Sequence, residues 1–79
     1  LNNLEDALLK VKKAVELSSS NRTQQAGIID TEAEVLWKLK RYDEAIIAIE
    51  KAISIDPENK YFLDQKQKFK ESKNNDQSV

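Results

Sequence analysis

The sequence predicts an all-α fold in which about four antiparallel helices pack as successive hairpins. Along most of the chain, apolar residues recur at intervals of three and four, which places them on one face of a helix. The 79 residues include a single Gly and a single Pro, so we expect few and short connections. We therefore expect one helical domain over residues 1–72 and a disordered polar tail over residues 73–79. Because the chain begins at Leu1, we also expect it to be a piece of a longer protein.

The composition argues against several classes of function. The 13 basic and 14 acidic residues are balanced, which disfavours a surface dedicated to nucleic acid or to an anionic membrane. No apolar run approaches the roughly 20 residues that span a bilayer, and no signal-peptide pattern is present. The chain has no His and no Cys, so catalytic or metal chemistry would lack its usual side chains. We expect a non-catalytic chain without metal or cofactor, and its location stays open, with the cytoplasm slightly favoured.

Two helices are predicted in the first half of the chain. The first has an apolar stripe with intervals of three and four, formed by Leu1, Leu4, Leu8, Val11 and Val15. Residues 18–21 are Ser-Ser-Ser-Asn, which ends this helix and offers capping groups to the next. The second helix is predicted from about residue 23 to residue 40, and its apolar set is Ala26, Ile29, Ala33, Leu36 and Leu39.

The stretch over residues 42–57 predicts a third helix with clear ends. Asp43 and Glu44 favour a helix N-terminus, and Pro57 cannot continue a helix. Its apolar face comprises Ala45, Ile46, Ile49, Ala52 and Ile53. After a turn capped by Asp56 or Asn59, a fourth helix from about residue 58 to residue 72 carries Tyr61, Phe62, Leu63 and Phe69. The predicted core comprises Leu8, Val11, Leu36, Ile49 and Ile53.

An internal repeat relates the first and third predicted helices. A shift of 38 residues (45 − 7 = 38) brings Ala7 and Ala14 onto Ala45 and Ala52, and the large apolar positions stay apolar. The acidic pairs at residues 5–6 and 43–44 also coincide. Amphipathicity alone does not require Ala at a fixed phase, so we interpret the two helices as copies of one helix–turn–helix module that stacks on its neighbour.

Residues 38–57 closely resemble the tetratricopeptide repeat. In that family a Tyr opens the second helix, two alanines seven apart line it, and Asp-Pro closes it; the matching residues are Tyr42, Ala45, Ala52, Asp56 and Pro57. Ala33 matches the small residue of the family's first helix. The resemblance covers about residues 26–59 and, more weakly, residues 4–17. It implies a short superhelix of stacked hairpins that binds a protein or peptide.

The sequence departs from the family pattern at several positions. Lys40 stands where Gly is usual before the aromatic residue, and Glu32 stands where a large apolar residue is usual. Ser19 replaces the Pro that would close the first copy. Four residues, 22–25, are extra, so we expect a longer connection and a non-standard packing angle between the two units.

The resemblance places a partner-binding groove on the face that carries Asp30, Glu34 and Trp37, which are spaced four and three apart. The full set of candidate groove residues is Asp30, Glu34, Trp37, Lys38, Tyr61, Asp64 and Lys68. Asp30 and Glu34 would repel a terminal carboxylate, so we do not expect a carboxylate-clamp ligand. They form either an acidic patch for a basic partner or a solvated face whose charges suit the helix dipole.

The aromatic and basic residues also have two interpretations each. Trp37 either grips a peptide in the groove or packs on the first helix beside Ala33. The lysines of the last helix could contact nucleic acid or anionic lipid, but they lack a Gly-rich or aromatic-stacking context, and we favour a solubilising end cap. These lysines are Lys60, Lys66, Lys68, Lys70 and Lys73.

Protein–protein interaction, as a scaffold or adaptor, is the function that these patterns favour. One alternative is self-association into a weak homodimer through exposed end faces. Another is an accessory module of a larger enzyme, because residues 30–39 loosely resemble helical segments appended to thioredoxin-like proteins, although the Cys pair of those proteins is missing here. The expected partner is a protein or peptide of unknown identity, and we expect neither nucleic acid nor membrane.

Overall fold

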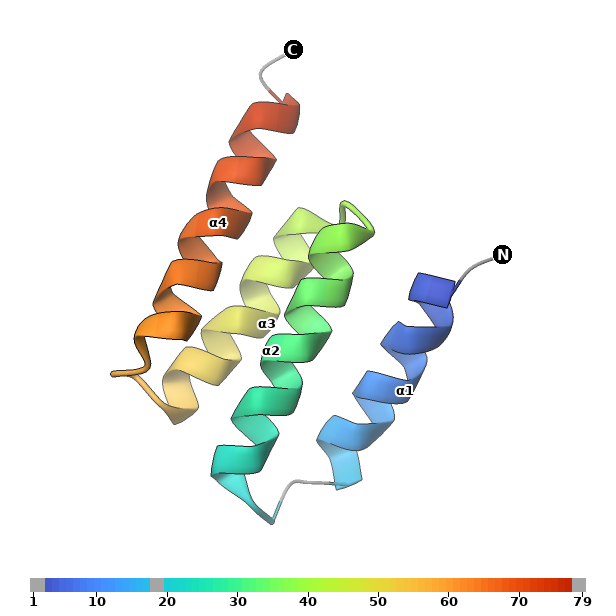
Figure 1. The fold of residues 1–79 in the computed structure, drawn as a ribbon, viewed down its shortest axis with the longest axis vertical. Helices are drawn as coiled ribbons and strands as arrows, with labels where there is room; N and C mark the ends of the chain where they lie inside the picture. Colours follow the sequence, from blue (N-terminus) through green and yellow to red (C-terminus); the bar gives the residue numbers. More distant parts are fainter. Residues whose placement is uncertain (1–2, 18–19, 78–79) are drawn as a thin grey trace.

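The computed structural model describes residues 3–17 and 20–77 and confirms the all-α fold. Its four helices are α1 (Asn3–Leu17), α2 (Arg22–Lys38), α3 (Tyr42–Ile55) and α4 (Lys60–Gln77). Each helix packs on the next along the chain, so the four stand in a row with alternating direction, and α1 and α3 run the same way (Figure 1). Leu1 of the predicted apolar stripe, Ser18 and Ser19 of the predicted first connection, and residues 78–79 of the predicted tail lie outside the described residues.

Asparagine side chains cap the second and fourth helices. The Asn21 Oδ1 atom accepts a hydrogen bond of 3.1 Å from the backbone N–H of Gln24, which satisfies an unpaired donor of the first turn of α2. The Asn59 Oδ1 atom accepts from the backbone N–H of Phe62 at 3.2 Å in the same way. Asn59 also donates to Asp56 through its side-chain amide. Of the two caps predicted for α4, the structure therefore uses Asn59.

The turn between α2 and α3 places a lysine in the left-handed region of backbone space. Lys40 has a φ of 64°, the only positive φ of a non-glycine residue in the described part of the chain. The Lys40 N–H donates to the Trp37 carbonyl and the Arg41 N–H donates to the Leu36 carbonyl, both at 2.9 Å. This is the hydrogen-bond pattern of a Schellman motif, in which Gly usually takes the left-handed position. Lys40 therefore departs from the family pattern in residue type, while its backbone keeps the left-handed conformation that Gly would take there.

The core lies along the interfaces that α2 and α3 make with each other and with their outer neighbours. Its largest fully buried side chains are Phe69, Leu36 and Ile49. The other buried apolar residues are Leu8, Ala26, Ile29, Ala33, Val35, Ala45, Ala48, Ala52 and Phe62. Leu8, Leu36 and Ile49 confirm the predicted core.

Two predicted core residues are less deeply placed than expected. Ile53 is partly buried and packs against the core, whereas Val11 is only half-buried on α1. The reason is geometric: α1 stands at the end of the row, and its extensive packing is on α2 (Figure 1). A residue on the flank of α1 therefore has fewer neighbours than its counterpart on α3.

The fourth helix extends beyond its predicted end. It runs to Gln77, so residues 73–77, which were expected to belong to a disordered tail, are helical. Polar contacts with the start of α3 hold this segment. The Tyr42 hydroxyl donates to Asp76 at 2.7 Å, and Lys73 forms an ion pair with Asp43. The segment lacks apolar residues, and for this reason its sequence gave no helical signal.

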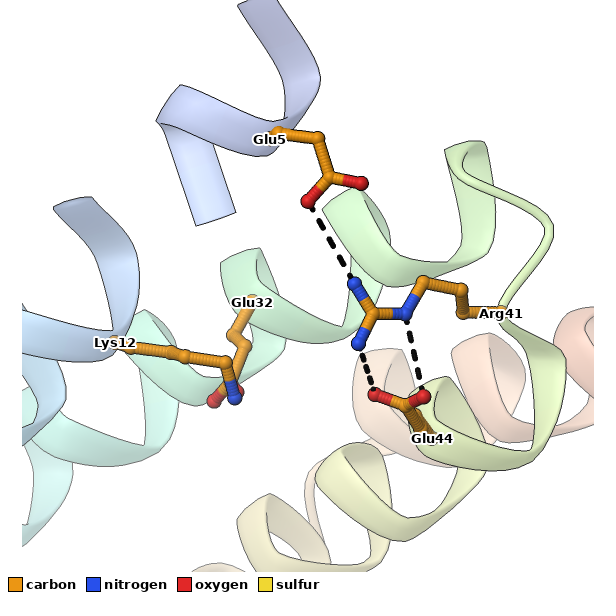
Figure 2. A network of polar contacts seen from close by, with 5 residues as sticks. All are labelled: Glu5, Lys12, Glu32, Arg41 and Glu44. Carbon is orange, nitrogen blue, oxygen red and sulfur yellow. Dashed lines mark hydrogen bonds and ion pairs between the residues drawn. The ribbon is translucent and has the colours of Figure 1, made fainter. Parts of the chain in front are cut away.

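A polar network ties α1 to the rest of the chain (Figure 2). The Arg41 guanidinium lies between two carboxylates, 3.7 Å from Glu5 on α1 and 2.7 Å from Glu44 on α3. Lys12 of α1 forms an ion pair of 2.9 Å with Glu32 of α2, whose side chain is only 14% exposed. The charge of Glu32, which departs from the family pattern, is therefore compensated by a lysine from the neighbouring helix.

Candidate protein-binding face

Four of the predicted groove residues come together where α4 passes α2. Asp30, Glu34 and Trp37 lie on one side of α2, and Lys68 reaches them from α4. In the row of helices, α3 stands between α2 and α4 (Figure 1). Side chains of α2 and α4 nevertheless meet directly, because Gln65 donates to Glu34. We call this cluster the α2–α4 face and define it by Asp30, Glu34, Trp37 and Lys68, together with Gln65.

Gln65 joins the two carboxylates of the face. Its Nε2 atom donates to Asp30 Oδ1 at 3.2 Å and to Glu34 Oε1 at 2.8 Å. Gln65 itself is buried, and Asp30 is only 9% exposed, so Asp30 does not belong to a solvated helix face. Burial raises the pKa of Asp30, although the hydrogen bond from Gln65 acts in the opposite direction. The same Gln65 amide lowers the pKa of Glu34, with a further contribution from the charge of Lys68.

Trp37 packs on the fourth helix, not on the first. Its ring centroid lies 6.1 Å from that of Phe69, and its indole N–H donates to the Ser72 hydroxyl at 2.8 Å. Trp37 is partly buried, and the indole N–H of a Trp in such a place usually finds a hydrogen-bond partner. Ring packing and the hydrogen bond together fix the orientation of Trp37, while one side of the ring stays accessible to a cation.

That cation is the ammonium group of Lys68. Its Nζ atom lies 4.2 Å from the centroid of the Trp37 ring and 5.5 Å from that of Phe69. The same atom lies 3.5 Å from Glu34 Oε1. A ring face and a carboxylate of α2 thus approach one ammonium group of α4. We call the pair formed by the Glu34 carboxylate and the Trp37 ring the ammonium site.

The remaining predicted groove residues lie around this cluster. Tyr61 is 58% exposed, and the negative charge of Asp30 is the main reason why its pKa is raised. Lys38 is exposed on α2 beside Trp37, and its charge helps to lower the pKa of Glu34. Asp64 does not join the cluster through any described contact and instead pairs with Lys60 at 3.5 Å on the outside of α4.

A shallow hollow of about 400 Å³ opens next to Trp37, towards the C-terminal half of α4. Its lining includes Trp37, Lys38, Lys40, Tyr42, Ser72 and Asp76. The hollow lies between the turn that contains Lys40 and the segment of α4 beyond Ser72. It therefore exists because α4 continues past its predicted end.

The sequence-based prediction missed the residues of α4 that organise the face. Gln65 orients both carboxylates and Ser72 holds the indole, yet neither was a candidate. The available signal was the spacing of Phe62, Gln65, Phe69 and Ser72 at three, four and three residues, which places them on one helix face. Tyr61 and Leu63, which were grouped with the apolar residues of this helix, are exposed at 58% and 45%.

The described residues offer little for other kinds of site. Within residues 3–17 and 20–77, no group of three or more acidic side chains is placed to hold a metal ion. In the same part of the chain, every helix is too short or too polar to cross a membrane.

Comparison with family models supports the resemblance over a segment. Residues 31–59 match the model of the tetratricopeptide repeat. This segment comprises the C-terminal part of α2, the whole of α3 and the following turn. No match was found among curated proteins or among solved structures. The four antiparallel helices agree with the hairpin arrangement of such repeats. Residues 31–59 are therefore similar to a tetratricopeptide repeat, and repeats of this family generally act as protein–protein interaction scaffolds.

Proposed function

We propose that this chain is a non-catalytic protein-binding module and that its partner lies along the α2–α4 face. The observation that carries the proposal is the accessible combination of an aromatic ring and charged groups within a tetratricopeptide-repeat fold. Trp is over-represented among the residues that dominate binding energy in protein interfaces. Trp37 is held in a fixed orientation by Ser72 and Phe69, so a partner would lose little free energy in ordering it.

The charges of the face favour a partner segment other than a terminal carboxylate. Asp30 and Glu34 occupy its centre, and Gln65 already donates to both of them. A carboxylate at this place would meet two like charges and no remaining donor of the Gln65 amide. The hollow beside Trp37 offers room for a side chain of the partner next to the ring.

The single tryptophan provides a direct test, because Trp37 is the only such fluorophore in the chain. A library of short peptides of random sequence would be selected for binding to the chain, and each selected peptide would be titrated while the emission of Trp37 is recorded. We expect saturable changes of this emission. The Glu34→Arg variant should lose most of the binding of the selected peptides.

Glu16→Arg is the matched control, because Glu16 is an exposed residue of α1 and its replacement changes the net charge by the same amount. Circular dichroism would show that both variants keep the helical fold. Equal binding by the two variants would place the binding surface elsewhere. A selection that yields no binding peptide would contradict the proposed function for linear segments.

A further inference from the structure

The ammonium site holds a cation that belongs to the chain itself. Glu34 and the Trp37 ring both lie on α2, whereas Lys68 approaches from α4 and places its Nζ atom 3.5 Å from the carboxylate and 4.2 Å from the ring centroid. An aromatic face combined with a carboxylate is the chemistry by which proteins bind a positively charged side chain. The site therefore has the character of a recognition site for a basic residue.

We propose that the ammonium site recognises a Lys or Arg side chain of a partner segment, and that Lys68 is an internal occupant which this side chain displaces. The inference rests on the proposed function, since it names the partner chemistry of the same face. In the unbound chain Lys68 neutralises the site. In the complex, the basic side chain of the partner takes its place between Glu34 and Trp37.

Lys68 is suited to be displaced because its contacts are only partly buried. The Lys68 side chain is 40% exposed and that of Glu34 is 30% exposed, so water screens their ion pair. A lysine has a long flexible stem, and its ammonium group can move into solvent without moving the helix. Phe69, the neighbouring residue in the chain, anchors α4 by its fully buried ring and does not depend on Lys68.

The site itself should keep its shape when Lys68 leaves. Trp37 is oriented by the hydrogen bond to Ser72, and Glu34 is held by the Gln65 amide at 2.8 Å. The charge of Asp30, behind Glu34, adds to the negative potential that a basic side chain would meet. Lys38, an exposed residue of α2, also carries a charge close to Glu34.

The test compares two variants that remove the same charge from the same helix. Lys68→Gln vacates the ammonium site, whereas Lys70→Gln removes an exposed lysine two residues later for which the structure shows no ion pair in the described part of the chain. An end-capped tetralysine peptide is the probe and an end-capped tetraglutamate peptide is its control. Binding is followed by the emission of Trp37 at one fixed, low salt concentration.

Wild-type chain should bind tetralysine and not tetraglutamate. Lys68→Gln should tighten the binding of tetralysine by about 2- to 5-fold, the factor expected when a competing contact of this class is lost. Lys70→Gln should leave it nearly unchanged, and Glu34→Gln should weaken it. Equal effects of the two lysine variants, or weaker binding by Lys68→Gln, would overturn the role of Lys68 as a competitor.

The outcome also separates this inference from the proposed function. If tetralysine fails to bind any of these proteins while peptides selected from the random library still bind at the α2–α4 face, the recognition of basic residues is wrong and the protein-binding function stands. If no peptide of either kind binds, both fail together.

Discussion

Helices α1 and α3 carry copies of one sequence pattern, yet they are packed to different depths. Ala45 and Ala52 on α3 are fully buried, whereas their counterparts Ala7 and Ala14 on α1 are only half-buried. Helix α3 packs extensively on both α2 and α4, whereas the extensive packing of α1 is on α2 (Figure 1). In a stacked array, burial depends on the number of neighbouring helices as well as on the pattern of the helix itself.

The largest expected difference between the two helices is in the cost of truncating equivalent apolar residues. Ile49 is fully buried, and Ile49→Ala should lower the free energy of unfolding by roughly 2–5 kcal/mol because it leaves a cavity. Its counterpart Val11 is half-buried, and Val11→Ala should cost about 1 kcal/mol or less. Urea denaturation followed by circular dichroism measures both values.

So large a loss could unfold a chain of this size, and Ile49→Val provides a milder variant with an expected cost of about 0.5–1.5 kcal/mol. If Val11→Ala is as destabilising as Ile49→Ala, α1 is covered more completely than the described packing shows.

The next difference concerns enlargement of the alanines. Ala52→Leu should overpack the core around α3 and cost roughly 1–3 kcal/mol, because Ala52 has no exposed surface. The same change at the repeat-related position, Ala14→Leu, should stay within about 0.5 kcal/mol because the longer side chain can turn towards solvent. The two variants are chemically identical, so a difference in their urea midpoints reports packing alone. Equal midpoints would show that the two alanines share one environment.

Much of the fold follows from local signals in the sequence. The spacing of apolar residues predicts four helices, and Asn21 and Asn59 lie where the structure uses them as caps. These features depend on residues that are close together in the chain, so that local physical chemistry determines them. The segment 73–77 is the exception, because tertiary contacts with Tyr42 and Asp43 hold its polar residues in a helix.

The candidate face was less predictable because its organisation depends on distant residues. Spacing on α2 correctly groups Asp30, Glu34 and Trp37, since they share one helix face. The depth of Asp30 depends on Gln65, which lies 35 residues further along the chain. No local pattern indicates that a glutamine, and not solvent, meets these carboxylates.

A smaller effect concerns the strained turn that precedes α3. Lys40 adopts a φ of 64°, which costs a non-glycine residue roughly 1–2 kcal/mol in the left-handed region. Lys40→Gly should therefore stabilise the chain, by about 1 kcal/mol or less once the greater freedom of Gly in the unfolded chain is included. Thermal melts measure the gain. Lys40→Ala is the control, because it removes the charge and keeps the strain; an equal gain from Ala would assign the effect to charge.

The last and smallest effect is the pH dependence of stability that arises where α4 meets α2. This contact involves Asp30 and Glu34 of α2 and belongs to the α4 side of α3, a side that α1 lacks. Burial raises the pKa of Asp30 above its usual 3.8, so the folded chain holds this proton more tightly than the unfolded chain does. The resulting stability is present below the unfolded pKa and is lost as pH rises through the folded one. Glu34 has a pKa lowered from 4.5, so its contribution is present above 4.5 and is lost as pH falls through the folded pKa.

The two carboxylates should therefore respond to neutral substitution with opposite signs. At pH 7, Asp30→Asn should raise the urea midpoint because it removes a buried charge while its amide oxygen can still accept from Gln65. Glu34→Gln should lower the midpoint at pH 7, because the ion pair with Lys68 and a charge-assisted hydrogen bond are lost. Both differences should shrink as the pH is lowered from 7 through the range in which the wild-type carboxylates become protonated, which for Glu34 lies below its usual pKa of 4.5. Shifts of the same sign at pH 7 would mean that Gln65 compensates both charges equally, and the buried position of Asp30 would then carry no electrostatic cost.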